Sequence, residues 1–140
     1  MARFMPFVAV EALLFSTDPA SYLPHRHPFL FLDRVLELEK GQRAVACLHV
    51  SALSGYSPIL MVEAVAQLAG IVTVDAEGEG GFLAAIERAE FHGQASEGDL
   101  LTIRAEVIKN FGRLFMVTGQ VLCGEKQLLS VNLTLGVGTL

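Results

Sequence analysis

The sequence predicts an α+β fold in which a curved antiparallel sheet wraps around one long helix. An almost unbroken apolar segment, Ile59–Val74, follows Ser57 and Pro58, whose hydroxyl and fixed φ make a favourable helix start. We therefore expect a buried helix that ends near Asp75. After Gly81 the apolar residues alternate with polar ones, as in strands with one buried face. A helix that is apolar on all sides needs walls on all sides, and a curved sheet supplies most of them.

About six strands are expected around this helix. Two stretches precede the helix, and four alternating stretches separated by turn residues follow it. The expected strands are residues 29–40, 43–50, 81–91, 101–108, 113–122 and 127–137. Ahead of the first strand, Asp18 should cap a short helix that begins at Pro19. Nothing reads as a linker or a repeat, so residues 1–140 are expected to form a single domain.

The composition is apolar for a chain of this size. Hydrophobic residues make up 52% of the 140 residues, and charged residues make up 18%. This favours an oligomer, a buried ligand tunnel, or both. The net charge of −5 and the lack of a basic run argue against nucleic-acid binding. The apolar helix segment is too short, and too polar at its centre, to span a membrane.

Two further features concern the compartment and the cofactors. Pro6 and Glu11 interrupt the apolar N-terminal run and no small-residue cleavage site follows, so an export signal is not expected. Cys47 and Cys123 lie in expected strands and lack the spacing of a metal site or a redox pair, which predicts buried free thiols. We expect a cytoplasmic protein without metal or cofactor.

Glu63 and Gln67 are the polar interruptions of the apolar helix. They stand four residues apart, so they share one face of the helix. An unpaired carboxylate in a protein interior is costly, which means that Glu63 needs either a function or a partner. We interpret it as a functional carboxylate that Gln67 orients. The alternative is a structural carboxylate, hydrogen-bonded across a dimer interface or to Gln67.

Two motifs resemble those of the (3R)-hydroxyacyl-acyl carrier protein dehydratases, the FabZ-like family with the hotdog fold. "LPHRHPFLFLDRV" (Leu23–Val35) resembles the family's entry segment, and "VEAVAQLAG" (Val62–Gly70) resembles its central-helix motif. The strands that follow match in spacing, so the resemblance covers roughly residues 20–138. It implies removal of water from a β-hydroxyacyl thioester carried by acyl carrier protein or coenzyme A. It also implies a homodimer or higher oligomer, in which the strand after the helix pairs with its copy.

The resemblance also implies roles for the site. In the family, the helix carboxylate protonates and positions the departing hydroxyl, and a loop histidine of the partner subunit takes the proton beside the thioester carbonyl. Amides at the helix start hold the thioester oxygen. Glu63 matches the carboxylate position, and a tunnel beside the helix would bury it and suit it to act as an acid. The candidate binding residues are Tyr56, Pro58, Ile59, Gln67 and Gly70, the last because a missing side chain would let an acyl chain pass.

The chain departs from the family's pattern before the helix. The family carries a Gly-His-Phe-Pro loop there, whereas this chain has the shorter "SALSGYSP" (Ser51–Pro58), and no histidine lies between His49 and His92. Pro58 stands where the family usually has glycine, so one candidate oxyanion donor is absent. His49 is a candidate replacement base, the alternative being an ordinary strand histidine. The histidines of "LPHRHPF" are expected to be structural, as in the family.

Three functions follow from these observations. The first is a FabZ-like dehydratase of reduced activity. The second is a non-catalytic acyl-carrier-binding or partner subunit that keeps the fold and Glu63. The third is a hotdog thioesterase in which Glu63 activates water. The missing loop favours the second function over the first, whereas the retained carboxylate favours the first and the third. Whether the chain is an enzyme is left open at this point.

Overall fold

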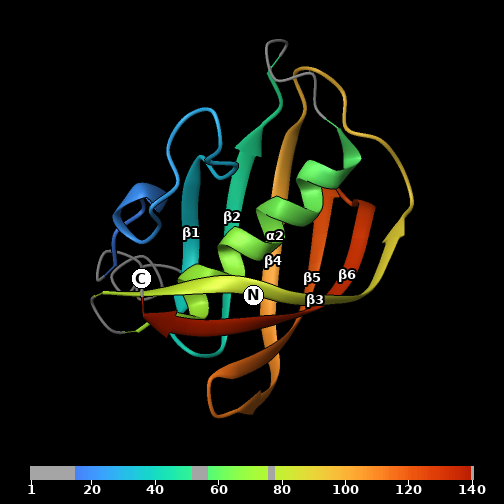
Figure 1. Ribbon diagram of the computed structural model, residues 1–140. Coiled ribbons are helices and arrows are strands. Elements are labelled where there is room, and N and C mark those ends of the chain that lie inside the picture. Colours follow the sequence, from blue (N-terminus) through green and yellow to red (C-terminus); the bar gives the residue numbers. More distant parts are fainter. Residues whose placement is uncertain (1–14, 52–56, 76–77, 140) are drawn as a thin grey trace, which may run out of the picture.

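The computed structural model describes residues 15–51, 57–75 and 78–139, which form one antiparallel sheet and one long helix (Figure 1). The helix is α2 (Pro58–Thr73). The strands are β1 (Arg34–Glu39), β2 (Arg43–His49), β3 (Glu79–Phe91), β4 (Leu100–Phe111), β5 (Leu114–Cys123) and β6 (Lys126–Thr139). This confirms the expected α+β arrangement of six strands around one helix.

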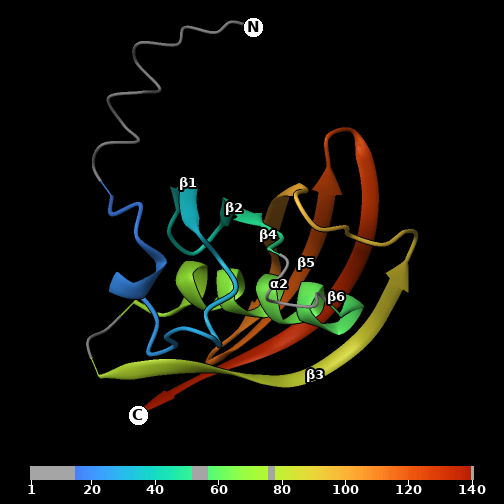
Figure 2. The same cartoon turned by 90° about the horizontal axis from the view of Figure 1, so that it is seen from above.

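The sheet curls around α2. Its strand order is β1-β2-β4-β5-β6-β3, so β1 and β3 form the two edges. Neighbouring strands run antiparallel throughout. Figures 1 and 2 show β1, β2 and β4 on one side of the helix, while β6 and β3 bend across to its other side. The helix therefore packs against five strands, β2 to β6.

The core lies between α2 and the concave face of the sheet. Met61, Val65 and Leu68 on the helix are fully buried, as are Ile103 and Leu133 among the strand residues that face it. Close approach of the helix to β5 depends on a missing side chain, because a Cβ at Gly119 would overlap the side chain of Val65. Burial of this apolar surface is the main source of stability for such a domain.

The first strand begins later than the sequence indicates. Residues 29–40 were expected to be extended throughout, but β1 starts only at Arg34. The reason is a long-range contact: the N–H of Phe31 and the carbonyl of Phe29 both bond to the side chain of Gln67 on α2. These backbone groups are thereby satisfied by the helix and need no neighbouring strand.

The expected start of α2 is confirmed, and its end comes slightly earlier than Asp75. Ser57 is the N-cap residue and Pro58 is the first helical residue, but the Ser57 hydroxyl makes no capping hydrogen bond. The last helical residue is Thr73, followed by Val74 in an extended conformation. The short helix before β1 is a single 3-10 turn over Pro19–Ser21, capped by Asp18 as expected. No described helix has the length and apolarity that a membrane crossing requires.

Strand β3 differs from the other strands because most of it is exposed. It is hydrogen-bonded to β6 along one side only. Its large apolar side chains Phe82, Leu83, Ile86 and Phe91 all lie at least partly in solvent. An apolar edge strand of this length is a ready surface for pairing with another chain. The two cysteines are free thiols, as expected, although each is only half-buried.

Candidate functional site

A cleft of about 470 Å³ opens beside α2. One wall is the helix face with Glu63, Gln67 and Gly70, and the other walls come from the segment before β1, which includes His25, and from β3, which includes Phe82. Glu63 and Gly70 are seven residues apart, which corresponds to roughly 10 Å along a helix. The cleft is therefore elongated, with Glu63 toward one end, and Glu79 of β3 also lines it. It suits a long ligand with a polar head and an apolar tail.

Gln67 is 3% exposed, and its side-chain amide makes three hydrogen bonds. Its Oε1 accepts a hydrogen bond from the N–H of Phe31 at 2.9 Å. Its Nε2 donates to the carbonyl oxygen of Phe29 at 2.8 Å and to Oε2 of Glu63 at 2.9 Å. The last contact is the one that the four-residue spacing predicts. Gln67 thus fastens the segment before β1 to the helix and holds one oxygen of the Glu63 carboxylate.

The carboxylate itself is not buried within a single chain. The side chain of Glu63 is 39% exposed, so its burial in a tunnel stays a prediction. Ile59, one turn earlier on the helix, is 57% exposed. The segment before β1 covers Gln67 but leaves this end of the helix open.

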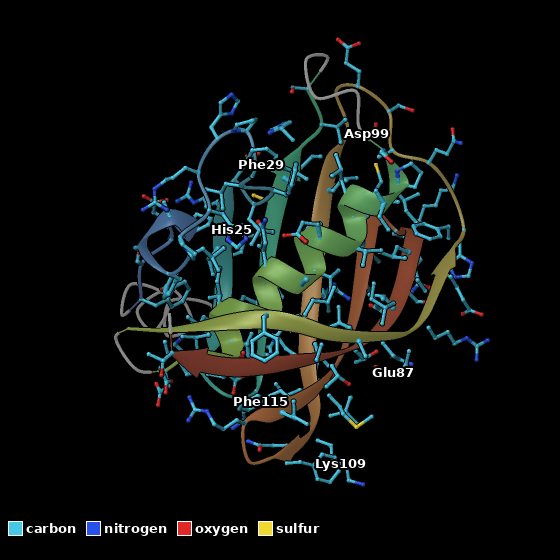
Figure 3. All side chains as sticks on the ribbon, in the orientation of Figure 1. His25, Phe29, Glu87, Asp99, Lys109 and Phe115 are labelled. Carbon is cyan, nitrogen blue, oxygen red and sulfur yellow. The ribbon has the colours of Figure 1, made fainter. Side chains whose placement is uncertain are left out.

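His25 lies beside Glu63, which the sequence did not indicate. Figure 3 labels His25 on the segment before β1. Its Nε2 is 3.8 Å from Oε2 of Glu63, and its side chain is 34% exposed. Its other ring nitrogen, Nδ1, is buried and has no hydrogen-bond partner within the described part of the chain. The segment that carries His25 is held against α2 by the Gln67 contacts, so the position of this ring depends on the same glutamine. No periodicity links position 25 to position 63, which is why sequence reasoning missed this neighbour.

The start of α2 has one amide without a partner among the described residues. Pro58 has no N–H, and the N–H of Leu60 donates to the carbonyl oxygen of Ser57 at 2.9 Å. Within residues 15–51, 57–75 and 78–139, the N–H of Ile59 makes no hydrogen bond. It lies one helical turn, ~6 Å, before Glu63. Unpaired amides at a helix N-terminus are suited to hold a developing negative charge.

The remaining candidates lie elsewhere. Neither Pro58 nor Ile59 is among the residues that line the cleft. His49 is exposed at the end of β2, where its backbone N–H donates to Oδ2 of Asp33 at 2.7 Å, and it does not line the cleft either. Tyr56 lies outside the described residues. The structure thus brings Glu63, Gln67 and Gly70 together and adds His25 to them.

The chain is similar along most of its length to known dehydratases. It is 41% identical over 110 residues to the 3-hydroxyacyl-[acyl-carrier-protein] dehydratase FabZ of Ruminiclostridium cellulolyticum, a match that covers 69% of this chain and 78% of that protein. It is 35% identical over 130 residues to FabZ of Geobacillus thermodenitrificans, with coverage of 79% and 90%. The chain belongs to the FabZ dehydratase family. A scan against protein-family models finds no match.

Solved structures agree on the fold. The dehydratase heterocomplex ApeI:P from Xenorhabdus doucetiae matches with a TM-score of 0.75 and 18% identity, over 87% of this chain and 91% of that one. The fluoroacetyl-CoA thioesterase FlK matches with a TM-score of 0.63 and 16% identity, over 74% of this chain and 90% of that one. These likenesses confirm the hotdog fold. Membership of the FabZ family places the function of this chain in acyl-thioester chemistry.

Proposed function

We propose that this chain binds a β-hydroxyacyl or enoyl thioester of acyl carrier protein or coenzyme A in the cleft, with Glu63 as the proton donor. The observation that carries the proposal is the geometry of the carboxylate. Gln67 holds its Oε2 at 2.9 Å, and the exposed side chain leaves the other oxygen accessible at the wall of an elongated cleft. A positioned acid at the end of an acyl-sized groove is what dehydration of such a thioester needs.

The proposed reaction is the loss of water from a β-hydroxyacyl thioester. A base removes the proton from the carbon beside the thioester carbonyl, and the electron pair of that bond forms the new carbon–carbon double bond. The hydroxyl leaves the next carbon and takes the proton of Glu63, so that water is released. Negative charge that develops on the thioester oxygen is placed against the N–H of Ile59, the amide available at the helix start.

We expect dehydration catalysed by this chain alone to be slow. Its sequence has no histidine between His49 and His92, where the resemblance places the loop base. General-base catalysis is typically worth roughly two to four decades in rate. Pro58 also removes one amide donor, a contact worth on the order of 2.7–4 kcal/mol where such donors have been deleted. Glu63 is retained, so weak turnover that depends on it is the expected behaviour.

The test is an assay of the hydration of a crotonyl-type thioester, monitored through the absorbance of the enoyl group. We expect weak activity that disappears in Glu63→Gln and is unchanged in His49→Ala. Turnover that survives Glu63→Gln would remove the proton-donor role. A loss in His49→Ala would identify that histidine as the base. Release of free thiol in the same samples would instead favour thioester hydrolysis.

A second candidate is a partner subunit for a dehydratase with an intact loop. It is favoured by the short Ser51–Pro58 stretch and by the structural likeness to ApeI:P, which is itself a dehydratase heterocomplex. In such a pair, the partner's loop histidine would face Glu63. Mixing this chain with an intact FabZ-family dehydratase should raise turnover above the sum of the two, and Glu63→Gln should abolish the gain. Additive rates and separate elution in gel filtration would reject the partner role.

The oligomeric state is also proposed. Two copies of β3 would pair edge to edge and cover apolar side chains such as Phe82, which is 58% exposed in the single chain. Light scattering is expected to give at least a dimer at micromolar concentration, and a monomer would remove this proposal. The cytoplasmic location stays a prediction.

A further inference from the structure

Two side chains converge on the same oxygen of Glu63. Gln67 Nε2 donates to Oε2 at 2.9 Å, and His25 Nε2 lies 3.8 Å from that same atom. In the described part of the chain, Oε1 has no hydrogen-bond partner. The two carboxylate oxygens are therefore inequivalent. Oε2 has two nitrogen neighbours from the protein, whereas Oε1 is available to a ligand.

The environment of the His25 ring selects its tautomer. Nδ1 is buried without a partner among the described residues. A proton at Nδ1 would be a buried donor without an acceptor, and it would leave an unprotonated Nε2 3.8 Å from Oε2 of Glu63, with two acceptors facing each other. The single proton of the neutral ring is therefore expected at Nε2. Nε2 lies 3.8 Å from Oε2 of Glu63, so in this tautomer the ring offers a donor to the carboxylate and not a base.

We propose that His25 is a positioning residue that donates from Nε2 to Oε2 of Glu63, so that the carboxyl proton resides on Oε1. Two donors on Oε2 make it the acceptor oxygen of the carboxyl group, and the proton of the acid form then occupies the oxygen that is free for the substrate hydroxyl. The present distance of 3.8 Å exceeds that of a hydrogen bond. Contacts of this kind tighten when substrate engages the exposed carboxylate. The inference rests on the proposed role of Glu63 as the acid.

The decisive experiment is independent of turnover. In the full chain labelled with ¹⁵N-histidine, the imidazole nitrogen resonances report which nitrogen carries the proton, and His25→Gln and His27→Gln assign their signals. His25 is expected as the Nε2–H tautomer, and its Nε2 resonance is expected to shift in Glu63→Gln while that of the exposed His27 stays unchanged. A proton on Nδ1, or no response to Glu63→Gln, would overturn the inference.

Kinetics separate a donor from a base. Glutamine can donate from its side-chain amide but cannot accept a proton, so His25→Gln should keep most of kcat. His25→Ala should lower kcat by about tenfold or more with little change in KM, and His27→Gln should behave as wild type. Equal losses in the glutamine and alanine variants would show that His25 is a base, contrary to the proposal. An inactive wild type with the expected Nε2–H signal and shift would remove the proposed function and leave the placement of His25 standing.

Discussion

The two ends of α2 are completed in different ways. At the carboxyl end, the chain supplies donors for the last carbonyl groups. Lys40 Nζ donates to the carbonyl oxygens of Ile71 and Val74 at 2.7 and 2.5 Å, and the N–H of Gly41 donates to the carbonyl oxygen of Val72 at 2.8 Å. These residues belong to the end of β1 and its turn, so the sheet itself closes this end of the helix.

The amino end is left open by comparison. The Ser57 hydroxyl makes no capping bond, and the N–H of Ile59 is unpaired in the part of the chain that the structure describes. Glu63 lies one turn further along, with its side chain 39% exposed. An amino end with an unpaired amide among the described residues supports the proposal that a polarised carbonyl is held there.

The largest expected effect concerns Gln67, which joins the segment before β1 to the open half of the helix. Gln67→Met removes three hydrogen bonds and leaves the N–H of Phe31 without its partner. We expect the free energy of unfolding to fall by about 2–3 kcal/mol. Denaturant titration measures this, with Gln42→Met, on an exposed turn, as the control. A change of the same size in the control would show that the contacts of Gln67 are not the cause.

The next effect tests the cleft between the two ends. A Cβ at Gly70 would meet only Leu23 Cδ2, at an ordinary 3.6 Å, so Gly70→Ala should fold well and gain stability from its better helix propensity. Gly70→Leu should project into the cleft and weaken binding of a long-chain thioester by about tenfold or more. Titration with long-chain and short-chain thioesters measures this. Equal affinity of the alanine and leucine variants for the long chain would contradict the proposed path of the acyl group.

Much of this fold is visible in the sequence, because the elements of the sheet and helix are set by local periodicity. The starts of α2 and of the hairpin strands follow from Pro58 and from alternation, and they are where the pattern predicts. The late start of the first predicted strand could not be foreseen. It depends on Gln67, which is 36 residues away from Phe31 in sequence.

The site was predicted less completely than the fold. The pair of Glu63 and Gln67 follows from helical spacing, and the structure shows its hydrogen bond. His25 reaches Glu63 only because the loop before β1 folds back over α2, and no local pattern encodes that return. The exposure of Glu63 also could not be inferred, since an apolar flank in the sequence does not say how much of the helix the rest of the chain covers.

A smaller effect is expected at the closed carboxyl end. Lys40→Met removes the two hydrogen bonds to the last carbonyls of α2. Burial lowers the pKa of Lys40, and the charge of Asp75 opposes this, so part of the gain from these bonds is offset by desolvation of the ammonium. We expect a loss of about 1 kcal/mol in the free energy of unfolding, with no change in thioester binding. A loss of binding would show that the two ends are coupled.

The smallest effect is expected at Ser57. An N-cap serine replaced by alanine usually costs about 1 kcal/mol, because its hydroxyl accepts a hydrogen bond from an amide of the first turn. Here the hydroxyl makes no such bond, so Ser57→Ala should change the free energy of unfolding by less than about 0.5 kcal/mol.

If the open amino end is kept for a ligand, Ser57→Asp should be the informative counterpart. Its carboxylate can accept from the N–H of Ile59, which is unpaired among the described residues, and this should stabilise the helix and compete with the thioester carbonyl. Thermal unfolding of both variants measures the change in stability, and thioester titration measures the change in affinity. A Ser57→Ala variant that loses a full 1 kcal/mol would mean that the chain caps this end in solution, and the contrast between the two ends of α2 would then disappear.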